Sequence, residues 1–294
     1  MSRYRFSYVP GYFVDGPEAA KACAGSKLTT QLNLGLRERI YDTPGDAAGE
    51  SLWVRFTKHL EWLNNNSPQG VSYKLFYLLR HGLSVHNMVM EKVGGEAWKS
   101  HWSHLESDGE VTWVDAKLME DGIGLARQLG HLWLEWAGTT GVPLPETLYT
   151  SPLARCLETT KLVYAPVMAK HEINFQPVVK ELLRERLTNH TCDKRSTRLW
   201  IAEHYPEYVL DQDFEMEDTL WRADRYETND EHVARKRRLL EDIFANDKST
   251  FLSLTTHSYA ISAILELVEA PHFCVSEGAI VPLLIKAEEV KREV

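Results

Sequence analysis

The stretch "YKLFYLLRHGLSVHN", residues 73–87, decides the fold that we expect for this chain. The mostly apolar run at 75–79 has the length and composition of a strand that is buried on both faces of a parallel sheet. The run stops abruptly at Arg80, His81 and Gly82. A cation, an imidazole and a glycine at the end of a buried strand point to a functional edge of the sheet.

Two further segments repeat this form, with an apolar strand candidate, then a polar cluster, then a helix candidate. They are "TLYTSPLARCLET" at 147–159 and "FLSLTTHSYAISA" at 251–263. In an open parallel sheet, ligands bind beyond the carboxyl ends of the strands. If the three strands are neighbours, one crevice receives the side chains of Arg80, His81, Asn87, Arg155 and His257.

Strand and helix patterns alternate from residue 73 onward. The segments 121–138 and 259–268 have helical spacing, and a third helix is expected to open with Ser151 as its cap and Pro152 in its first turn. This alternation predicts an α/β fold, a three-layer α/β/α sandwich with a mostly parallel central sheet. We expect a single domain over 1–294, with residues 1–72 as an N-terminal extension packed on it and an insertion or lid at about 185–230.

Composition limits the partners that we expect. The 294 residues carry a formal charge of −9, which disfavours nucleic acid and an anionic membrane surface but allows a local cationic pocket for a small anion. The four cysteines form no C-x-x-C pair, so we expect free thiols. We find neither a signal peptide nor an apolar stretch of roughly 18 residues, and therefore expect a cytoplasmic protein. The oligomeric state stays open.

The residue types in the crevice suggest phosphoryl chemistry. Two guanidinium groups match the oxygens of a phosphate, and a neutral imidazole can attack phosphorus to form a phosphohistidine. The other imidazole and the arginines would stabilise charge on the transferred group. A carboxylic acid is the usual donor to the leaving oxygen, and "KELLRERLTNHTCDKR" at 180–195 offers Glu181 and Glu185.

Several motifs in this order resemble one family. They are "LLRHGLSVHN" (78–87), "SPLARCLET" (151–159), "LLRERLTNHTCDKR" (182–195) and "TTHS" (255–258), together with "VPGYF" (9–13) and "DTLWRADRYET" (218–228). The chain thereby resembles the histidine phosphatase (phosphoglycerate mutase-like) superfamily, and in particular its fungal and plant phosphomutase-like branch. The resemblance implies that His81 is the phosphorylated nucleophile and Glu185 the proton donor, and that neither metal nor cofactor is needed. It also implies a phosphate pocket made by Arg80, Arg155, His257 and Asn87.

The chain departs from the pattern of this branch at a few positions. Leu83 stands where the branch usually has Gln after "RHG", and Tyr259 stands where a Gly usually follows Ser258. In "DAKLMEDGIGL" (115–125), Met119 and Leu125 replace the usual Thr and Gln. These differences lie in pocket lining and helix capping, so they bear on substrate choice more than on reaction type.

Other candidates have weaker support. Substrate-lining roles are possible for Leu83, Ser84, His86 and Ser258, and Asp193, Lys194 and Arg195 would either contact substrate or pin the insertion. We interpret Cys156 as a small packed residue. The basic run "ARKRRLL" (234–240) is interpreted as a solvated helix face.

The sequence therefore predicts a metal-independent phosphatase that hydrolyses a small phosphorylated metabolite through a phosphohistidine on His81, with Glu185 as proton donor. Three alternatives remain at this point. One is a phosphomutase that uses the same intermediate, and another is a phosphatase for an apolar (prenyl or aromatic) phosphate or diphosphate. The third is a non-catalytic phosphate-binding or interaction protein.

Overall fold

The computed structural model describes residues 3–44, 49–211 and 213–290, and it centres on a seven-stranded sheet. The strand order is β1-β9-β3-β7-β4-β5-β6, and β9 runs in the opposite direction to the other strands of this sheet. The mostly parallel sheet confirms the predicted class. The strands are β1 (Tyr4–Tyr8), β3 (Val71–Arg80), β4 (Thr147–Thr150), β5 (Val178–Val179), β6 (Val209–Leu210), β7 (Phe251–Thr256) and β9 (Ile280–Glu289).

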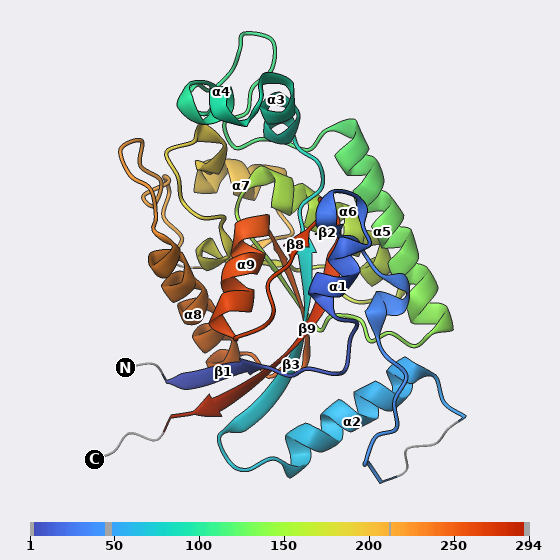
Figure 1. Cartoon of the computed structure of the whole chain (residues 1–294). Helices are drawn as coiled ribbons and strands as arrows, with labels where there is room; N and C mark the ends of the chain where they lie inside the picture. The colour runs from blue at the N-terminus through green and yellow to red at the C-terminus, as the bar shows by residue number, and fades with distance from the viewer. Residues whose placement is uncertain (1–2, 45–48, 212, 291–294) are drawn as a thin grey trace.

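Helices cover both faces of this sheet (Figure 1). One face carries α8 and α9, and the other carries α2, α5 and α6. The helices of the described chain are α1 (Gly16–Lys21), α2 (Leu52–Asn66), α3 (Val85–Val93), α4 (Gly95–Ser100), α5 (Glu120–Thr139), α6 (Ala154–Lys170), α7 (Arg198–His204), α8 (Asn229–Asn246) and α9 (Ser258–Leu267). None of these helices combines the length and apolarity that crossing a bilayer requires.

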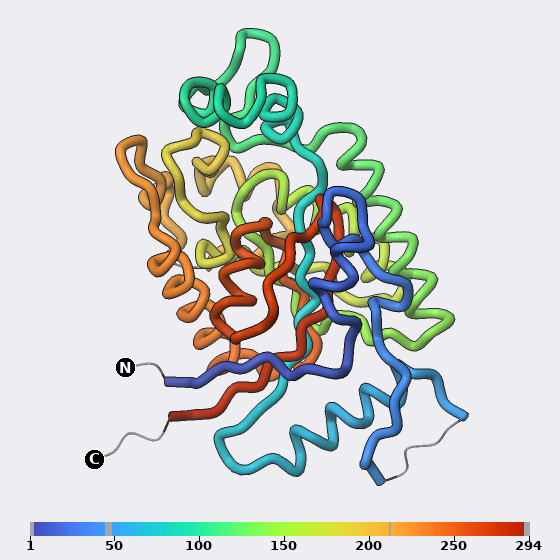
Figure 2. The backbone as a smooth tube through the Cα atoms, viewed as in Figure 1, coloured from blue at the N-terminus to red at the C-terminus, as the bar shows by residue number. Residues whose placement is uncertain are grey.

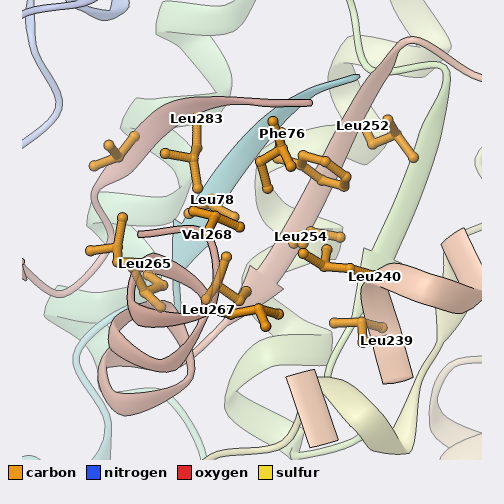
Figure 3. Close-up of a cluster of buried hydrophobic side chains, with 14 of the residues drawn as sticks. Phe76, Leu78, Leu239, Leu240, Leu252, Leu254, Leu265, Leu267, Val268 and Leu283 are labelled. Carbon is orange, nitrogen blue, oxygen red and sulfur yellow. The ribbon is translucent and has the colours of Figure 1, made fainter. Parts of the chain in front are cut away.

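β3 is the centre of the hydrophobic core because its side chains alternate between the two faces. Phe76 and Leu78 pack against α8 and α9 (Figure 3), and Leu75 and Leu79 pack on the opposite side against α2, α5 and α6. All four side chains are fully buried. Each such side chain contributes roughly 1.5–3 kcal/mol through burial. This packing fixes the carboxyl end of β3, where His81 follows.

The N-terminal segment is part of this architecture. β1 pairs with β9 from Tyr4↔Glu289 to Tyr8↔Ile285, so the first and last strands lie side by side (Figure 2). A second, two-stranded sheet joins β2 (Lys27–Leu28) in parallel to β8 (Cys274–Val275). The region that the sequence treats as an extension therefore supplies an outer strand and a brace for the segment after α9.

The segment at about 185–230 is more regular than we expected. It contains α7 and the short strand β6, which extends the sheet beyond β5. In Figure 1 the carboxyl end of β3 leads towards α3 and α4, while α2 lies at the opposite end of that strand. The polar clusters that follow β3, β4 and β7 thus share one edge of the sheet.

Two local predictions are wrong. α6 begins at Ala154 and not at Ser151 and Pro152, and its first amide donates to Asp115 Oδ1 at 2.8 Å, a carboxylate far away in sequence. The basic run on α8 is only partly solvated, because Arg235 and Lys236 are 7% and 0% exposed. The thiols are free, as predicted.

Candidate active site

Three neighbouring strands end at the same level and place their polar residues together. Arg80 is in register with Thr256, and the His81 amide donates to the Thr256 carbonyl at 3.0 Å. On the other side of β7, the Ser151 amide donates to the Thr255 carbonyl at 3.0 Å. The His81 and His257 rings consequently lie with their centroids 5.1 Å apart.

The ring of His81 is oriented by its own backbone. Nδ1 lies 2.8 Å from the Gly82 carbonyl oxygen, which can only accept, so Nδ1 carries the proton and Nε2 keeps its lone pair. Burial, reinforced by Arg155 and Arg80, holds the pKa of His81 well below its ordinary value. The imidazole is therefore neutral near pH 7, the state that a nucleophile requires.

Gly82 lies where the end of β3 approaches α5 closely. A Cβ atom on Gly82 would lie 2.7 Å from the Gly122 carbonyl oxygen, and one on Gly122 would lie 2.1 Å from the Leu83 carbonyl oxygen. The strand end and the first turn of α5 thus pack backbone against backbone. The Gly82 amide also donates to Thr159 Oγ1 of α6 at 3.0 Å. These contacts hold His81 between two helices.

Arg80 is almost completely buried, and its two terminal nitrogens are occupied. One donates to the Val275 carbonyl at 2.7 Å and the other lies 2.7 Å from Glu277 Oε1. The remaining Nε is buried and has no hydrogen-bond partner among the described residues.

Arg155 repeats this arrangement on the opposite side of His81. One terminal nitrogen donates to the Cys192 carbonyl at 2.8 Å, the other lies 3.5 Å from Asp193 Oδ1, and the buried Nε again has no partner in the described chain. An unpaired buried donor costs about 1–3 kcal/mol. Two such donors beside two imidazoles form a site for an anion with several acceptor oxygens.

His257 is held by residues at the neighbouring strand end. Its Nε2 lies 2.8 Å from Ser151 Oγ and 3.4 Å from Cys156 Sγ. Burial and then Arg155 lower the pKa of His257 well below its ordinary value. Burial raises the pKa of the Cys156 thiol, so Cys156 is not a thiolate nucleophile, in agreement with its interpretation as a packed residue.

Glu185 approaches this cluster from the segment after β5. Its Oε1 accepts the Arg186 amide at 2.9 Å, and its Oε2 accepts the Tyr259 amide at 3.2 Å and the Ser258 hydroxyl at 3.4 Å. Burial, and then the negative charge of Asp193, raise the pKa of Glu185. A carboxyl that keeps its proton at higher pH is suited to act as an acid. Glu181 instead forms salt bridges with Arg184 and Arg195.

Residues 83–87 follow His81 and lead into α3. Asn87 Oδ1 accepts from the Ser84 amide at 3.2 Å and from the Ser84 hydroxyl at 2.8 Å, which caps α3. Ser84 Oγ also lies 2.7 Å from His86 Nδ1. Burial and then the two arginines lower the pKa of His86, so it belongs to the same electrostatic environment. Leu83 is half-buried, and its carbonyl accepts the Met119 amide at 3.0 Å.

Residues 193–195 were expected either to contact substrate or to pin the insertion, and their contacts differ from one residue to the next. Asp193 faces Arg155 and also accepts from Thr188 Oγ1 at 2.6 Å. Lys194 Nζ lies 5.3 Å from the centre of the Trp221 ring. Arg195 donates to Glu181 and to three backbone carbonyls, so its contacts pin the insertion.

Several contacts that orient the side chains of the site were not predicted from the sequence. Val275, Cys192 and Glu277 orient the arginines, and Ser151 orients His257 instead of capping α6. A signal existed for Ser151, because it follows β4 as His257 follows β7. The aromatic residues Trp98 and Trp113 are buried in a cluster of their own with Cys192.

One group in the described residues has the composition of a metal site. His190, Cys192 and Asp193 bring one potential ligand atom each within 4.8 Å of one another. The surroundings disfavour a cation, because Arg155 lies against Asp193 and burial raises the pKa of the Cys192 thiol.

Comparison with known proteins agrees with this geometry. A sequence model of the histidine phosphatase superfamily (branch 1) matches residues 76–273. A probable phosphoglycerate mutase of Arthroderma benhamiae is 40% identical over 288 residues, covering 96% of this chain and 84% of that protein. A probable phosphoglycerate mutase of Saccharomyces cerevisiae is 31% identical over 258 residues, covering 78% and 87%.

Solved structures resemble the fold at lower similarity. A mycobacterial glucosyl-3-phosphoglycerate phosphatase is 18% identical with a TM-score of 0.43, and the match covers 72% of this chain and 90% of that one. A putative alpha-ribazole-5'-P phosphatase from Escherichia coli is 17% identical with a TM-score of 0.44, covering 71% and 89%.

Proposed function

Because the chain belongs to the histidine phosphatase superfamily, we propose that it is a metal-independent phosphatase with His81 as nucleophile and Glu185 as proton donor. The substrate class is a small phosphorylated metabolite. The observation that supports this most directly is the matched pair of buried arginines. Each has a buried Nε without a partner among the described residues, and the charges of both help to lower the pKa of His81, so a phosphoryl group bound by both arginines would satisfy these donors.

The reaction has two steps. Nε2 of His81 attacks phosphorus, the ester P–O bond breaks, and Glu185 gives its proton to the leaving oxygen. Water then attacks the phosphohistidine, Glu185 takes a proton from it, and the P–N bond breaks to release inorganic phosphate. Arg80, Arg155 and His257 stabilise the charge on the transferred group in both steps.

Trapping the intermediate tests this mechanism. With a ³²P-labelled phosphomonoester quenched in alkali, which preserves phosphohistidine, we expect the label on His81. The His81→Ala variant should lose the label and at least ~10⁴-fold in kcat while it keeps its circular dichroism spectrum. Label on a different residue, or unchanged turnover by the variant, would overturn the proposal.

A phosphomutase is the second candidate, favoured by the names of the fungal relatives. It would use the same phosphohistidine but return the phosphoryl group to another hydroxyl of the bound molecule. Product analysis discriminates between them, since a phosphatase accumulates inorganic phosphate and a mutase accumulates the isomeric ester. We expect inorganic phosphate.

A further inference from the structure

Helix α8 directs two consecutive basic side chains into the protein. Arg235 and Lys236 are 7% and 0% exposed, although both belong to a run that looks solvated in the sequence. Arg235 is paired with Glu227, through Nε at 2.8 Å and a terminal nitrogen at 2.7 Å. Lys236 is fully buried, and the described residues place no carboxylate within salt-bridge distance of it. Burial, and then the charge of Arg235, lower the pKa of Lys236 well below its ordinary value, so the contacts that hold this side chain in the interior need explanation.

Both side chains donate to the backbone that carries Glu185. Lys236 Nζ lies 2.7 Å from the Leu182 carbonyl and 2.6 Å from the Arg184 carbonyl. Arg235 donates to the Arg184 carbonyl at 3.0 Å and to the Glu185 carbonyl at 2.8 Å. A short 3₁₀ helix (Glu181–Leu183) ends within this segment, so the carbonyls at its end and beyond it depend on side chains for their hydrogen bonds.

We propose that Arg235 and Lys236 are positioning residues that hold the backbone of residues 182–185 so that the Glu185 carboxyl meets the leaving oxygen. The inference rests on the proposed function, because it takes Glu185 as the proton donor. Proton transfer requires a donor within hydrogen-bond reach of its acceptor, and small displacements cost much of the rate.

The wider contacts of the segment agree with this role. Thr256 Oγ1 donates to the Leu183 carbonyl at 2.6 Å, which ties the middle of the segment to the strand before His257. α8 holds the carbonyls on either side of this point. The charged groups that face Glu185 are Asp193, whose charge raises the pKa of that carboxyl, and Lys236, whose charge lowers it.

Leaving-group dependence tests the proposal. The leaving oxygen of an alkyl phosphate must be protonated as it departs. 4-Nitrophenyl phosphate instead releases a stable anion, which hardly requires a proton donor. We expect Glu185→Gln and Lys236→Met each to lower kcat on the alkyl ester by about 10- to 100-fold, and on 4-nitrophenyl phosphate by less than about 3-fold. KM on both substrates should hardly change.

A matched control separates positioning from general destabilisation. Lys74 is also buried and donates to two backbone carbonyls, those of Asp247 and Ser249, at the end of β3 remote from His81. Lys74→Met should lower the melting temperature as Lys236→Met does, without any leaving-group dependence. If Lys236→Met does not fold, Arg235→Met, which removes the donors to the Arg184 and Glu185 carbonyls, serves in its place with the same expected leaving-group dependence.

The possible outcomes are distinct. The positioning role is wrong if the Lys236 variant loses kcat equally on both substrates, or loses none on either. If Glu185→Gln itself lacks leaving-group dependence, the assignment of the proton donor fails, and the positioning role fails with it. If Glu185→Gln shows the dependence and the Lys236 variant does not, only the positioning role is wrong.

Discussion

The two arginines of the site are oriented in the same way by two unrelated segments, which we call the Arg80 wall and the Arg155 wall. The Arg80 wall, residues 274–278, supplies the Val275 carbonyl and the Glu277 carboxylate. The Arg155 wall, residues 188–193, supplies the Cys192 carbonyl and the Asp193 carboxylate. In both, a carbonyl and a carboxylate hold the two terminal nitrogens of the guanidinium, and Nε has no partner among the described residues. The arrangement follows from guanidinium geometry, not from any sequence motif.

The walls differ in their contact with water. The Glu277 side chain is 20% exposed and lies 3.6 Å from Lys27, whereas the Asp193 side chain is 8% exposed and accepts from Thr188. Charges in a drier environment interact more strongly and over longer distances. Asp193 accordingly raises the pKa of Glu185 in addition to orienting Arg155. We infer that the Arg155 wall tunes the chemistry, while the Arg80 wall mainly sets geometry.

Asp193→Asn should have the largest effect. The amide keeps the shape but removes the charge that faces Arg155 and raises the pKa of Glu185. Because the proposed proton donor Glu185 must be protonated to act, activity should fall as pH rises through its pKa, and the variant should show this fall at lower pH. We expect kcat/KM to drop by roughly 10- to 100-fold above that pH, measured as a pH profile. If the activity of the variant falls at the same pH as that of the unmodified protein, or at a higher pH, Asp193 does not tune Glu185.

Glu277→Gln should have a smaller effect. Its partly exposed ion pair with Arg80 contributes about 1 kcal/mol or less, and the amide oxygen can still accept from the guanidinium. The inhibition constant for inorganic phosphate should change by no more than about 5-fold, and the alkaline side of the pH profile should not move. A loss as large as that of Asp193→Asn would mean that the two walls are equivalent.

Lys27→Met should have the smallest effect. Lys27 is 46% exposed in its side chain and 3.6 Å from Glu277, a geometry that contributes about 0–0.5 kcal/mol. The melting temperature and kcat/KM of the Lys27→Met variant should equal those of the unmodified protein within error. A clear loss of phosphate affinity would show that the brace between β2 and β8 acts through this pair, which the exposure of Lys27 argues against.

The strand ends were predictable because their signal is local. The apolar run before Arg80 and His81, and the similar runs before Arg155 and His257, indicate buried parallel strands, and the parallel sheet brings their ends together. Helical spacing also predicted the helices at 121–138 and 259–268, where the structure has α5 and α9.

The contacts that orient the site were not predictable in this way. Backbone carbonyls such as those of Val275 and Cys192 leave no mark in a sequence, since every residue has one. Asp115 caps a helix that begins 39 residues later. Lys236 appears solvated because its backbone acceptors lie more than 50 positions away. Such contacts arise only from tertiary packing.

The position of β9 has a consequence for the order in which the molecule is built. β3, which leads to His81, is flanked by β7 and by β9, so both of its neighbours are synthesised long after it. The carbonyl and carboxylate that orient Arg80 also come from the segment just before β9. A nascent chain can pack α5 and α6 on β3 early, but until Val275 and Glu277 are made it lacks the groups that orient Arg80. If the proposed phosphate site is correct, we therefore expect phosphate binding only after the chain has been made and folded through β9.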